Sequence, residues 1–180
     1  MTSRKILGLD ISTSCTGLCC LDDNGTIISI EPIILTSHKT FVEKCNSIKE
    51  SLERVKKEQK ITDIFIEQNL SSFRRGLSSA HTINTLARFN GACSFIAYQV
   101  LGVDPVSLDV TNARNHLKIK IDHKDKTRNT KQKVFEWVDS KIHVEWPRKK
   151  NGDVRETAYD MADAYVIAMA GLMGCKEQLS

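Results

Sequence analysis

Near its N-terminus the chain reads Ile6-Leu7-Gly8-Leu9-Asp10, an apolar run that ends in a carboxylate. A second apolar run, Ile64-Phe65-Ile66-Glu67, ends in the same way. Both runs have the length and composition of buried strands. Carboxylates usually avoid the ends of buried runs, because burying an unpaired charge is costly. The two strands are therefore expected to bring Asp10 and Glu67 to a site that uses their charge.

A further pair of acids, Asp160 and Asp163, lies in a segment predicted to be a helix over about residues 157–173. Charges three residues apart share one face of a helix and repel each other unless a cation neutralises them. Taken singly, each acid has a simpler explanation, such as a turn at a strand end or a first-turn residue favoured by the helix dipole. Taken with Asp10 and Glu67, the pair predicts a site for two divalent metal ions. Oxygen ligands of this kind suit Mg²⁺ or Mn²⁺ rather than zinc.

The hydrophobic pattern predicts one α/β domain over residues 1–180. Its expected core is a mixed five-stranded sheet, three antiparallel strands followed by parallel strands, flanked by helices. The turn Asn24-Gly25 between two apolar runs is a strong hairpin signal. The predicted strands cover about 5–10, 16–21, 26–35, 63–67 and 105–109. The predicted helices cover 39–60 with Ser37 as a candidate cap, 79–101, a short helix capped by Thr111, 130–140 and 157–173.

The composition restricts the cellular setting. No apolar stretch approaches the ~20 residues that span a bilayer, and the first residues lack the long apolar region of a signal peptide. The six cysteines form no CxxC pair and have no histidine at zinc-finger spacing, which favours reduced thiols. An intracellular protein in a reducing compartment, with no membrane partner, is expected.

The positive charge is unevenly distributed. The net charge is +4, and residues 118–150 hold eleven Lys and Arg against five Asp and Glu. A basic stretch beside an acidic site favours a polyanion held over metal ions. A solvated basic face without a ligand is the alternative that this pattern leaves open.

Three motifs together resemble the RuvC family of Holliday-junction resolvases. They are Ile6-Leu7-Gly8-Leu9-Asp10 continuing to Gly17, then Ile66-Glu67-Gln68, then Asp160-Met161-Ala162-Asp163-Ala164. The resemblance covers nearly the whole chain in order and spacing. It implies the RNase H-like fold, a homodimer, and resolution of four-way DNA junctions by paired, metal-dependent nicks. The four acids would then hold two Mg²⁺ ions per active site, for which Mn²⁺ can substitute.

One departure limits the resemblance. The bacterial pattern has Pro-Gly after the first aspartate, where this chain has Ile11-Ser12. This is similar to divergent phage, viral or organellar members, so no cleavage-sequence preference is carried over.

The resemblance also implies DNA contacts. Lys131 is most similar to a catalytic basic residue of the family, and the position of its junction wedge falls nearest Leu70, with Phe73 three residues later. The long helix predicted over residues 79–101 corresponds to the element that pairs subunits. The remaining candidate DNA-binding residues are Arg74, Arg75, Lys118, Lys120, Lys124, Lys126 and Arg128.

Other functions stay open at this point. An RNase H-type nuclease on RNA–DNA hybrids, or a broader branched-DNA or flap nuclease, would keep the fold and change the substrate. The stretch Gly8–Ser14 also resembles the first phosphate loop of actin-like ATPases and sugar kinases, which close two domains around a nucleotide. This chain has room for one domain, so no nucleotide cofactor is expected. A non-catalytic DNA-binding relative is disfavoured, because all four acids are retained.

Overall fold

The computed structural model describes residues 3–68, 80–122 and 124–177, the last three without their side chains. Within these residues five strands and five helices follow one another along the chain. In order they are β1 (Lys5–Asp10), β2 (Cys15–Asp22), β3 (Ile27–Ile34), α1 (Phe41–Glu58), β4 (Asp63–Glu67), α2 (Ala80–Leu101), β5 (Pro105–Leu108), α3 (Val110–His116), α4 (Thr130–Asp139) and α5 (Thr157–Glu177).

The strands form one sheet in the order β3-β2-β1-β4-β5. Antiparallel pairing joins β1 to β2 and β2 to β3, whereas β4 runs parallel to both β1 and β5. The predicted mixed sheet is therefore confirmed. The parallel pairing aligns Leu9 with Ile66, so β1 and β4 end on the same side of the sheet.

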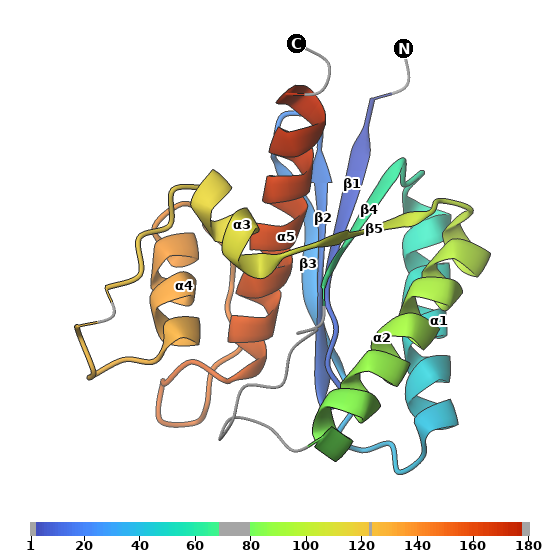
Figure 1. Ribbon diagram of the computed structural model, residues 1–180, viewed down its shortest axis with the longest axis horizontal. Coiled ribbons are helices and arrows are strands. Elements are labelled where there is room, and N and C mark those ends of the chain that lie inside the picture. Colours follow the sequence, from blue (N-terminus) through green and yellow to red (C-terminus); the bar gives the residue numbers. More distant parts are fainter. Residues whose placement is uncertain (1–2, 69–79, 123, 178–180) are drawn as a thin grey trace.

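Helices cover both faces of the sheet (Figure 1). The pair α1 and α2 packs on one face, and α5 packs on the other, with α3 and α4 lying against its outer side. Each face has its own buried core, one built around Leu52, Ile64 and Phe89 and the other around Ile6, Val134 and Ile167. In the described part of the chain, none of the helices combines the length and apolarity needed to cross a membrane.

Two glycines allow α5 to lie directly on the sheet. A Cβ on Gly8 in β1 would stand 2.4 Å from the Ala164 carbonyl oxygen, and one on Gly17 in β2 would stand 1.9 Å from the Asp160 carbonyl oxygen. Real Cβ atoms do not approach backbone so closely. The absence of side chains at Gly8 and Gly17 therefore sets the depth at which the first turns of α5 meet the sheet.

Two predicted helix caps are wrong. The cap of α1 is Thr40 rather than Ser37, because Thr40 Oγ1 accepts from Glu43 N while the Glu43 carboxylate accepts from Thr40 N. This reciprocal pair satisfies two free backbone donors, and Ser37 has no acid three residues later with which to form it. The cap of α3 is Asp109 rather than Thr111, because its carboxylate accepts from Asn112 N at 2.8 Å.

Candidate active site

The four acids predicted to form a site come from three elements that the fold brings together. Asp10 and Glu67 end the neighbouring parallel strands β1 and β4, and Asp160 and Asp163 lie in the first two turns of α5, over the same end of the sheet. Asp10 and Asp163 are buried, with 5% and 4% of their surface exposed. Glu67 and Asp160 are partly buried. Two of the four carboxylates are thus buried and the other two are partly buried, so none of them lies on an open surface.

The surroundings of Asp10 shift its pKa strongly. Burial raises its pKa well above the ordinary value, and the nearby carboxylates of Asp163 and Glu67 raise it further. Lys131 opposes this shift only partly. Carboxylates that raise one another's pKa are closely spaced like charges, and such a cluster is stabilised by a cation.

Asp163 lies between two basic side chains. Burial raises its pKa to about 6, although Lys131 and Arg114 both lower it. Arg114 NH2 lies 3.5 Å from Asp163 Oδ1, and Lys131 Nζ lies 3.8 Å from Asp163 Oδ2. Each oxygen of this carboxylate therefore faces a different cation.

Lys131 enters the cluster from the start of α4. Its Nζ donates to Asp160 Oδ1 at 2.7 Å. Burial alone lowers the pKa of Lys131, but the charges of Asp10 and Asp160 outweigh it, and the net pKa lies above the usual value for lysine. Lys131 is therefore fully charged at neutral pH and neutralises part of the acidic cluster.

A cysteine completes the surroundings of Asp160. The Cys15 side chain is buried and hydrogen-bonds Asp160; burial, then the Asp160 charge, raise the pKa of its thiol to about 12. The thiol therefore stays protonated and is not expected to act as a soft metal ligand. Beside Asp160 a cleft of about 380 Å³ opens between the loop after β1 and the starts of α4 and α5, lined among others by Ser12, Ser14 and Lys131.

The residues present fit a hard divalent cation. The donors are carboxylate oxygens, which Mg²⁺ and Mn²⁺ prefer. Asp163 is poorly satisfied by the protein itself: its Oδ1 is buried without a hydrogen-bond partner, and Lys131 Nζ is 3.8 Å from its Oδ2, beyond hydrogen-bond distance. Among the described residues, no three acidic, histidine or cysteine side chains are already arranged around a common ion position. Lys131 Nζ instead contacts two of the acids, at 2.7 Å from Asp160 Oδ1 and 3.8 Å from Asp163 Oδ2.

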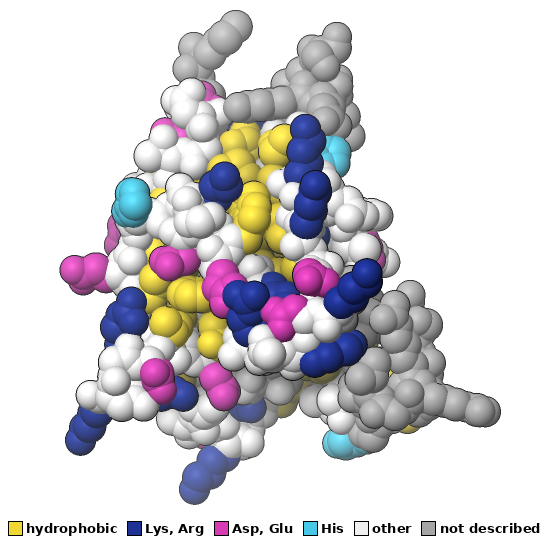
Figure 2. All heavy atoms as spheres, turned by 90° about the vertical axis from the view of Figure 1, so that its left-hand side faces the viewer, with side chains coloured by type: hydrophobic (Ala, Val, Ile, Leu, Met, Phe, Trp, Pro, Cys, Tyr) yellow, Lys and Arg dark blue, Asp and Glu magenta, His cyan; other side chains and the backbone are white. Residues whose placement is uncertain are grey.

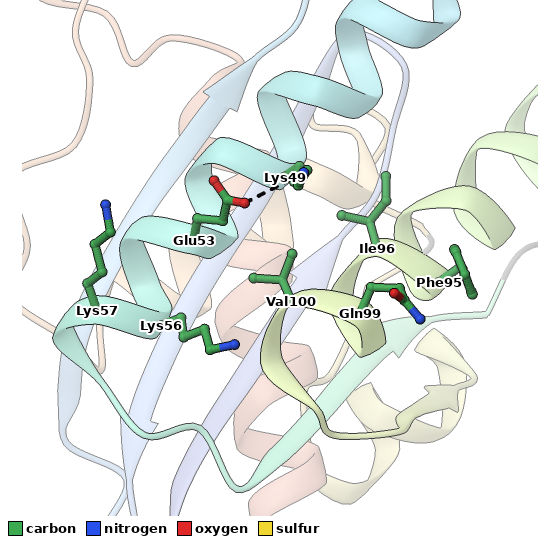
Figure 3. Close-up of a pocket in the computed structure, with 8 residues that line it drawn as sticks. All are labelled: Lys49, Glu53, Lys56, Lys57, Phe95, Ile96, Gln99 and Val100. Atoms are coloured by element: carbon green, nitrogen blue, oxygen red, sulfur yellow. Dashed lines mark ion pairs between the residues drawn. The ribbon is translucent and has the colours of Figure 1, made fainter.

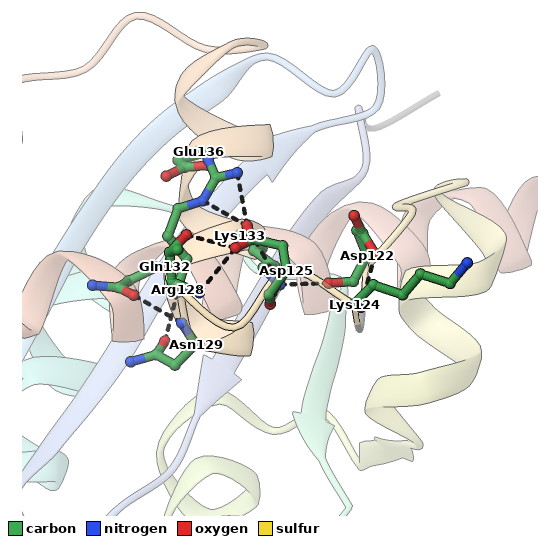
Figure 4. Close-up of polar contacts among 9 residues, drawn as sticks. Asp122, Lys124, Asp125, Arg128, Asn129, Gln132, Lys133 and Glu136 are labelled. Atoms are coloured by element: carbon green, nitrogen blue, oxygen red, sulfur yellow. Dashed lines mark hydrogen bonds and ion pairs between the residues drawn. The ribbon is translucent and has the colours of Figure 1, made fainter.

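Residues 118–128 form a basic arm that holds five of the candidate DNA-binding residues, but this arm is not a uniformly free cationic surface. Asp125 accepts from Thr127 and from Arg128, whose other guanidinium nitrogen pairs with Glu136. Lys133 Nζ donates to the backbone oxygens of Asp122 and Asp125 (Figure 4). Two basic side chains of this region therefore have partners within the protein: Arg128 pairs with Asp125 and Glu136, and Lys133 on α4 contacts the backbone of the arm and the Asp125 carboxylate.

The lysines predicted to bind DNA remain exposed. Figure 4 shows Lys124 pointing away from the contacts around Asp125. Lys118, at a positive φ of 55°, Lys120 and Lys126 lie in the same irregular segment, and all three are exposed. On the face formed by α3, α4 and α5, basic and acidic side chains are intermingled around an apolar strip (Figure 2). The candidates Leu70, Phe73, Arg74 and Arg75 lie outside the described residues.

The other face of the molecule carries a separate groove of about 560 Å³ between α1 and α2. Figure 3 shows Ile96 and Val100 on its floor and the ion pair of Lys49 with Glu53 along its rim. Phe95 points away from α1 and is 63% exposed. This groove lies across the sheet from the acidic cluster, so it is no part of the candidate active site.

Arg114 is a charged side chain that contacts the acidic cluster and that the sequence motifs did not reveal. It lies on α3, directly after β5, and β5 is the parallel neighbour of the strand that ends in Glu67. Parallel strands carry their functional residues at their carboxyl ends. An arginine six residues beyond the end of the last parallel strand was the signal that could have revealed it.

The sequence itself matches no protein-family model and no curated protein. The structure does match solved proteins. Thermus thermophilus RuvC has a TM-score of 0.64 at 14% identity, with 97% of each chain covered. The same protein in complex with a Holliday junction substrate matches with a TM-score of 0.64 at 16% identity, over 96% of each chain. The yeast mitochondrial Holliday junction resolvase Ydc2 has a TM-score of 0.57 at 15% identity, with 98% of this chain and 80% of that one covered. The chain therefore has the RNase H-like fold of RuvC and Ydc2 along nearly its whole length.

Proposed function

We propose that this chain is a structure-selective endodeoxyribonuclease that resolves four-way DNA junctions by paired, metal-dependent nicks. The observation that carries the proposal is the meeting of Asp10, Glu67 and the Asp160–Asp163 face at one end of a sheet whose fold matches, over 96% of the chain, a RuvC solved with a Holliday junction. Likeness at this identity establishes the fold alone. The convergence of acids within that fold supports the activity.

Asp10, Glu67, Asp160 and Asp163 would hold two Mg²⁺ ions, with Mn²⁺ as a substitute. Bound there, the ions would activate a water and stabilise the leaving 3′-oxygen during in-line attack on a phosphate. The protein's own part is to hold the carboxylates rigidly and to keep the site partly dry, so that charges act on the substrate with little screening. The buried position of Asp10 and Asp163 supports both tasks.

Lys131 is proposed to contact the scissile phosphate. Its ammonium group is held by Asp160 and lies at the edge of the cleft beside it. A side chain that is 51% exposed can turn from the carboxylates toward an incoming phosphate without unfolding α4. In that position it would stabilise the negative charge that develops on the phosphate oxygens.

Capture of the junction is proposed to depend on the phosphate backbone. The exposed lysines of the arm, Lys118, Lys120, Lys124 and Lys126, would track phosphates beside the site, together with Phe73, Arg74 and Arg75. Contacts of this kind position the nucleic acid without reading its sequence. Affinity should therefore fall steeply as the salt concentration rises.

The protein is proposed to act as a homodimer that pairs through α2. Two aromatic side chains three residues apart on this helix, Phe95 and Tyr98, are 63% and 48% exposed. Exposed aromatic residues are typical anchors of protein interfaces. A twofold axis would place one acidic cluster at each of two opposing strands of a junction.

We also propose a single nuclease domain that works inside the cell. One sheet with helices on both faces accounts for the described residues. The cysteines among them whose side chains are described are free thiols, which suits a reducing compartment.

The deciding experiment offers the purified protein four labelled substrates, with and without Mg²⁺: a four-way junction, a replication fork, a linear duplex and an RNA–DNA hybrid. Symmetric nicks confined to the junction, absent from the Asp10→Asn variant, are expected. Preferential cleavage of the hybrid would replace this proposal with an RNase H-type activity, and equal cleavage of forks and junctions would indicate a broader branched-DNA nuclease.

A further inference from the structure

Arg114 makes an unusual contact with the acidic cluster. Its guanidinium NH2 faces Asp163 Oδ1 at 3.5 Å, and only 19% of the side chain is exposed. This distance is at the outer limit of a hydrogen bond. Both Arg114 Nε and Asp163 Oδ1 are buried without a hydrogen-bond partner. Two adjacent buried polar groups are thus only loosely matched.

A purely structural ion pair does not explain this geometry well. Buried ion pairs stabilise a fold only when their geometry is close and the remaining donors and acceptors are satisfied. Native proteins leave few buried polar atoms unpaired, and those exceptions tend to mark functional sites. The pair is therefore poorly arranged for stability alone, although it joins α3 to α5.

The chain holds Arg114 firmly in place. The Asp109 cap fixes the start of α3, and Ala113 is buried against α5. The strand before α3 is also tied to the site, because Gln68 N, directly after Glu67, donates to Leu108 O at 2.8 Å. Arg114 is consequently delivered to Asp163 from the same end of the sheet as Glu67.

The two cations around Asp163 differ in burial. Lys131 is 51% exposed and Arg114 is 19% exposed. Lys131 also has a closer partner in Asp160, at 2.7 Å. Lys131 is free to move away when another cation arrives, whereas Arg114 is confined by the packing of α3 on α5.

We propose that Arg114 is a positioning residue for the metal site: it holds Oδ1 of Asp163 toward α3 so that Oδ2 is presented to the ions shared with the other acids. The inference rests on the proposed function for the identity of the site. Groups that orient a ligating side chain typically change metal affinity by about 10- to 100-fold when they are removed.

The direction in which metal affinity changes when Arg114 is removed distinguishes a positioning role from simple electrostatic repulsion. An arginine that acted only as a nearby positive charge would repel Mg²⁺ or Mn²⁺, and its removal would tighten metal binding. If the arginine positions Asp163, its removal weakens metal binding, because a carboxylate that is not held in place is a poorer metal ligand.

The test measures Mn²⁺ binding by calorimetry in the absence of DNA. Arg114→Met is expected to weaken Mn²⁺ binding by about tenfold or more, with Arg114→Lys in between. Arg148→Met removes the same charge from an arginine that donates to Gly152 O and touches no acid of the cluster, so it should leave the affinity unchanged. In an Asp163→Asn background, Arg114→Met should have little further effect.

Unchanged or tighter Mn²⁺ binding by Arg114→Met would overturn the inference, as would a parent protein that binds no Mn²⁺. Thermal unfolding of the parent, Arg114→Met, Asp163→Asn and the double variant in EDTA shows whether any of these proteins simply folds poorly. A parent that binds Mn²⁺ but cuts no junction would refute the proposed nuclease and still leave the affinity comparison to decide the role of Arg114.

Discussion

Lys131 Nζ donates to Asp160 Oδ1 at 2.7 Å and lies 3.8 Å from Asp163 Oδ2, so a protein cation bridges these two acids of the cluster. A divalent ion bound by the same two carboxylates would have to displace it. The same lysine is well placed to meet a phosphate once displaced. In the proposed mechanism Lys131 would therefore first give way to the metal ion and then contact the phosphate, so its ion pairs with the acids would oppose metal binding while its charge would assist cleavage.

Lys131→Met should consequently bind Mn²⁺ more tightly than the parent while cutting junctions more slowly. The affinity for Mn²⁺ is expected to rise roughly fivefold, because the metal no longer has to break one partly exposed ion pair. Mn²⁺ titration of the DNA-free protein measures it. Lys44→Met is the matched control, because Lys44 donates to Thr13 O and touches no carboxylate of the cluster. Weaker Mn²⁺ binding in Lys131→Met would contradict competition between lysine and metal.

Gly17 sets the position of Asp160. A Cβ at Gly17 would stand 1.9 Å from the Asp160 carbonyl oxygen, so Gly17→Ala must push the start of α5 away from β2. Overpacking of this kind costs about 1–3 kcal/mol of unfolding free energy. Mn²⁺ affinity should fall as well, because Asp160 moves with the helix. Gly174→Ala is the control. Gly174 lies on α5, as Asp160 does, and nothing stands within 4 Å of the Cβ it would gain, so neither the unfolding free energy nor the Mn²⁺ affinity should fall. Calorimetry and urea unfolding decide the matter, and a parent-like Gly17→Ala would show that α5 can shift freely.

The raised pKa of Asp163 predicts how stability depends on pH in the absence of metal. The folded protein keeps the proton up to a pKa of about 6, whereas the unfolded chain releases it near 3.8. Between these values the folded state binds more protons, so its stability falls as pH rises and the loss is complete above pH 6.

Asp163→Asn cannot titrate, and its advantage over the parent in EDTA should grow between pH 4 and pH 7 by on the order of 2 kcal/mol. The difference between the two proteins isolates Asp163 from other titrating groups. Thermal unfolding across this range measures it, and saturating Mg²⁺ should reverse the order at pH 7. A difference that stays constant with pH would mean that Asp163 is already ionised throughout.

Much of the site could be read from the sequence because local patterns carry it. Apolar runs ending in Asp10 and Glu67 mark two strand ends, and parallel pairing of the strands brings those ends together. The spacing of Asp160 and Asp163 places both on one helical face. Neither inference needs the details of packing, and the resulting sheet order was also within reach.

Contacts between distant parts of the chain were not accessible in the same way. Arg114 on α3 and Asp163 on α5 are separated along the chain by α4 and two irregular segments, and no local pattern joins them. The same holds for Arg128, which sequence charge alone assigns to DNA but which the structure pairs with Asp125 and Glu136. Counting charges along a chain cannot tell which cations are already neutralised.

The contacts of Asp125 predict that one acidic residue supports DNA binding. Hydrogen bonds, first from Thr127 and then from Arg128, hold the pKa of Asp125 well below its usual range, so it is ionised and anchors the arm. Asp125→Asn should loosen the arm and weaken junction binding several-fold, although removal of a negative charge near DNA would otherwise strengthen binding. Asp122→Asn is the control, because among the described residues the Asp122 carboxylate accepts only from Lys124 N, and this variant should bind DNA as well as the parent or better. Binding curves at several salt concentrations, in an Asp10→Asn background, distinguish the two.

Phe95 offers the sharpest test of the proposed dimer. It is 63% exposed on α2, and a charge there would be buried without a partner if α2 pairs with its copy. Phe95→Glu should therefore sediment as a monomer at concentrations where the parent is dimeric. Ile34→Glu introduces the same charge at a 51% exposed apolar position on β3, at the far edge of the sheet from β5, and should leave the dimer intact.

The monomeric variant should still bind Mn²⁺, since α2 contributes no acid to the cluster. Its junction cleavage should change in kind, because two independent monomers nick opposing strands at unrelated times, so singly nicked junctions would accumulate. If the Phe95→Glu protein stays dimeric, the dimer interface must lie on another surface. If it is monomeric yet makes both nicks together, junction resolution does not require the dimer.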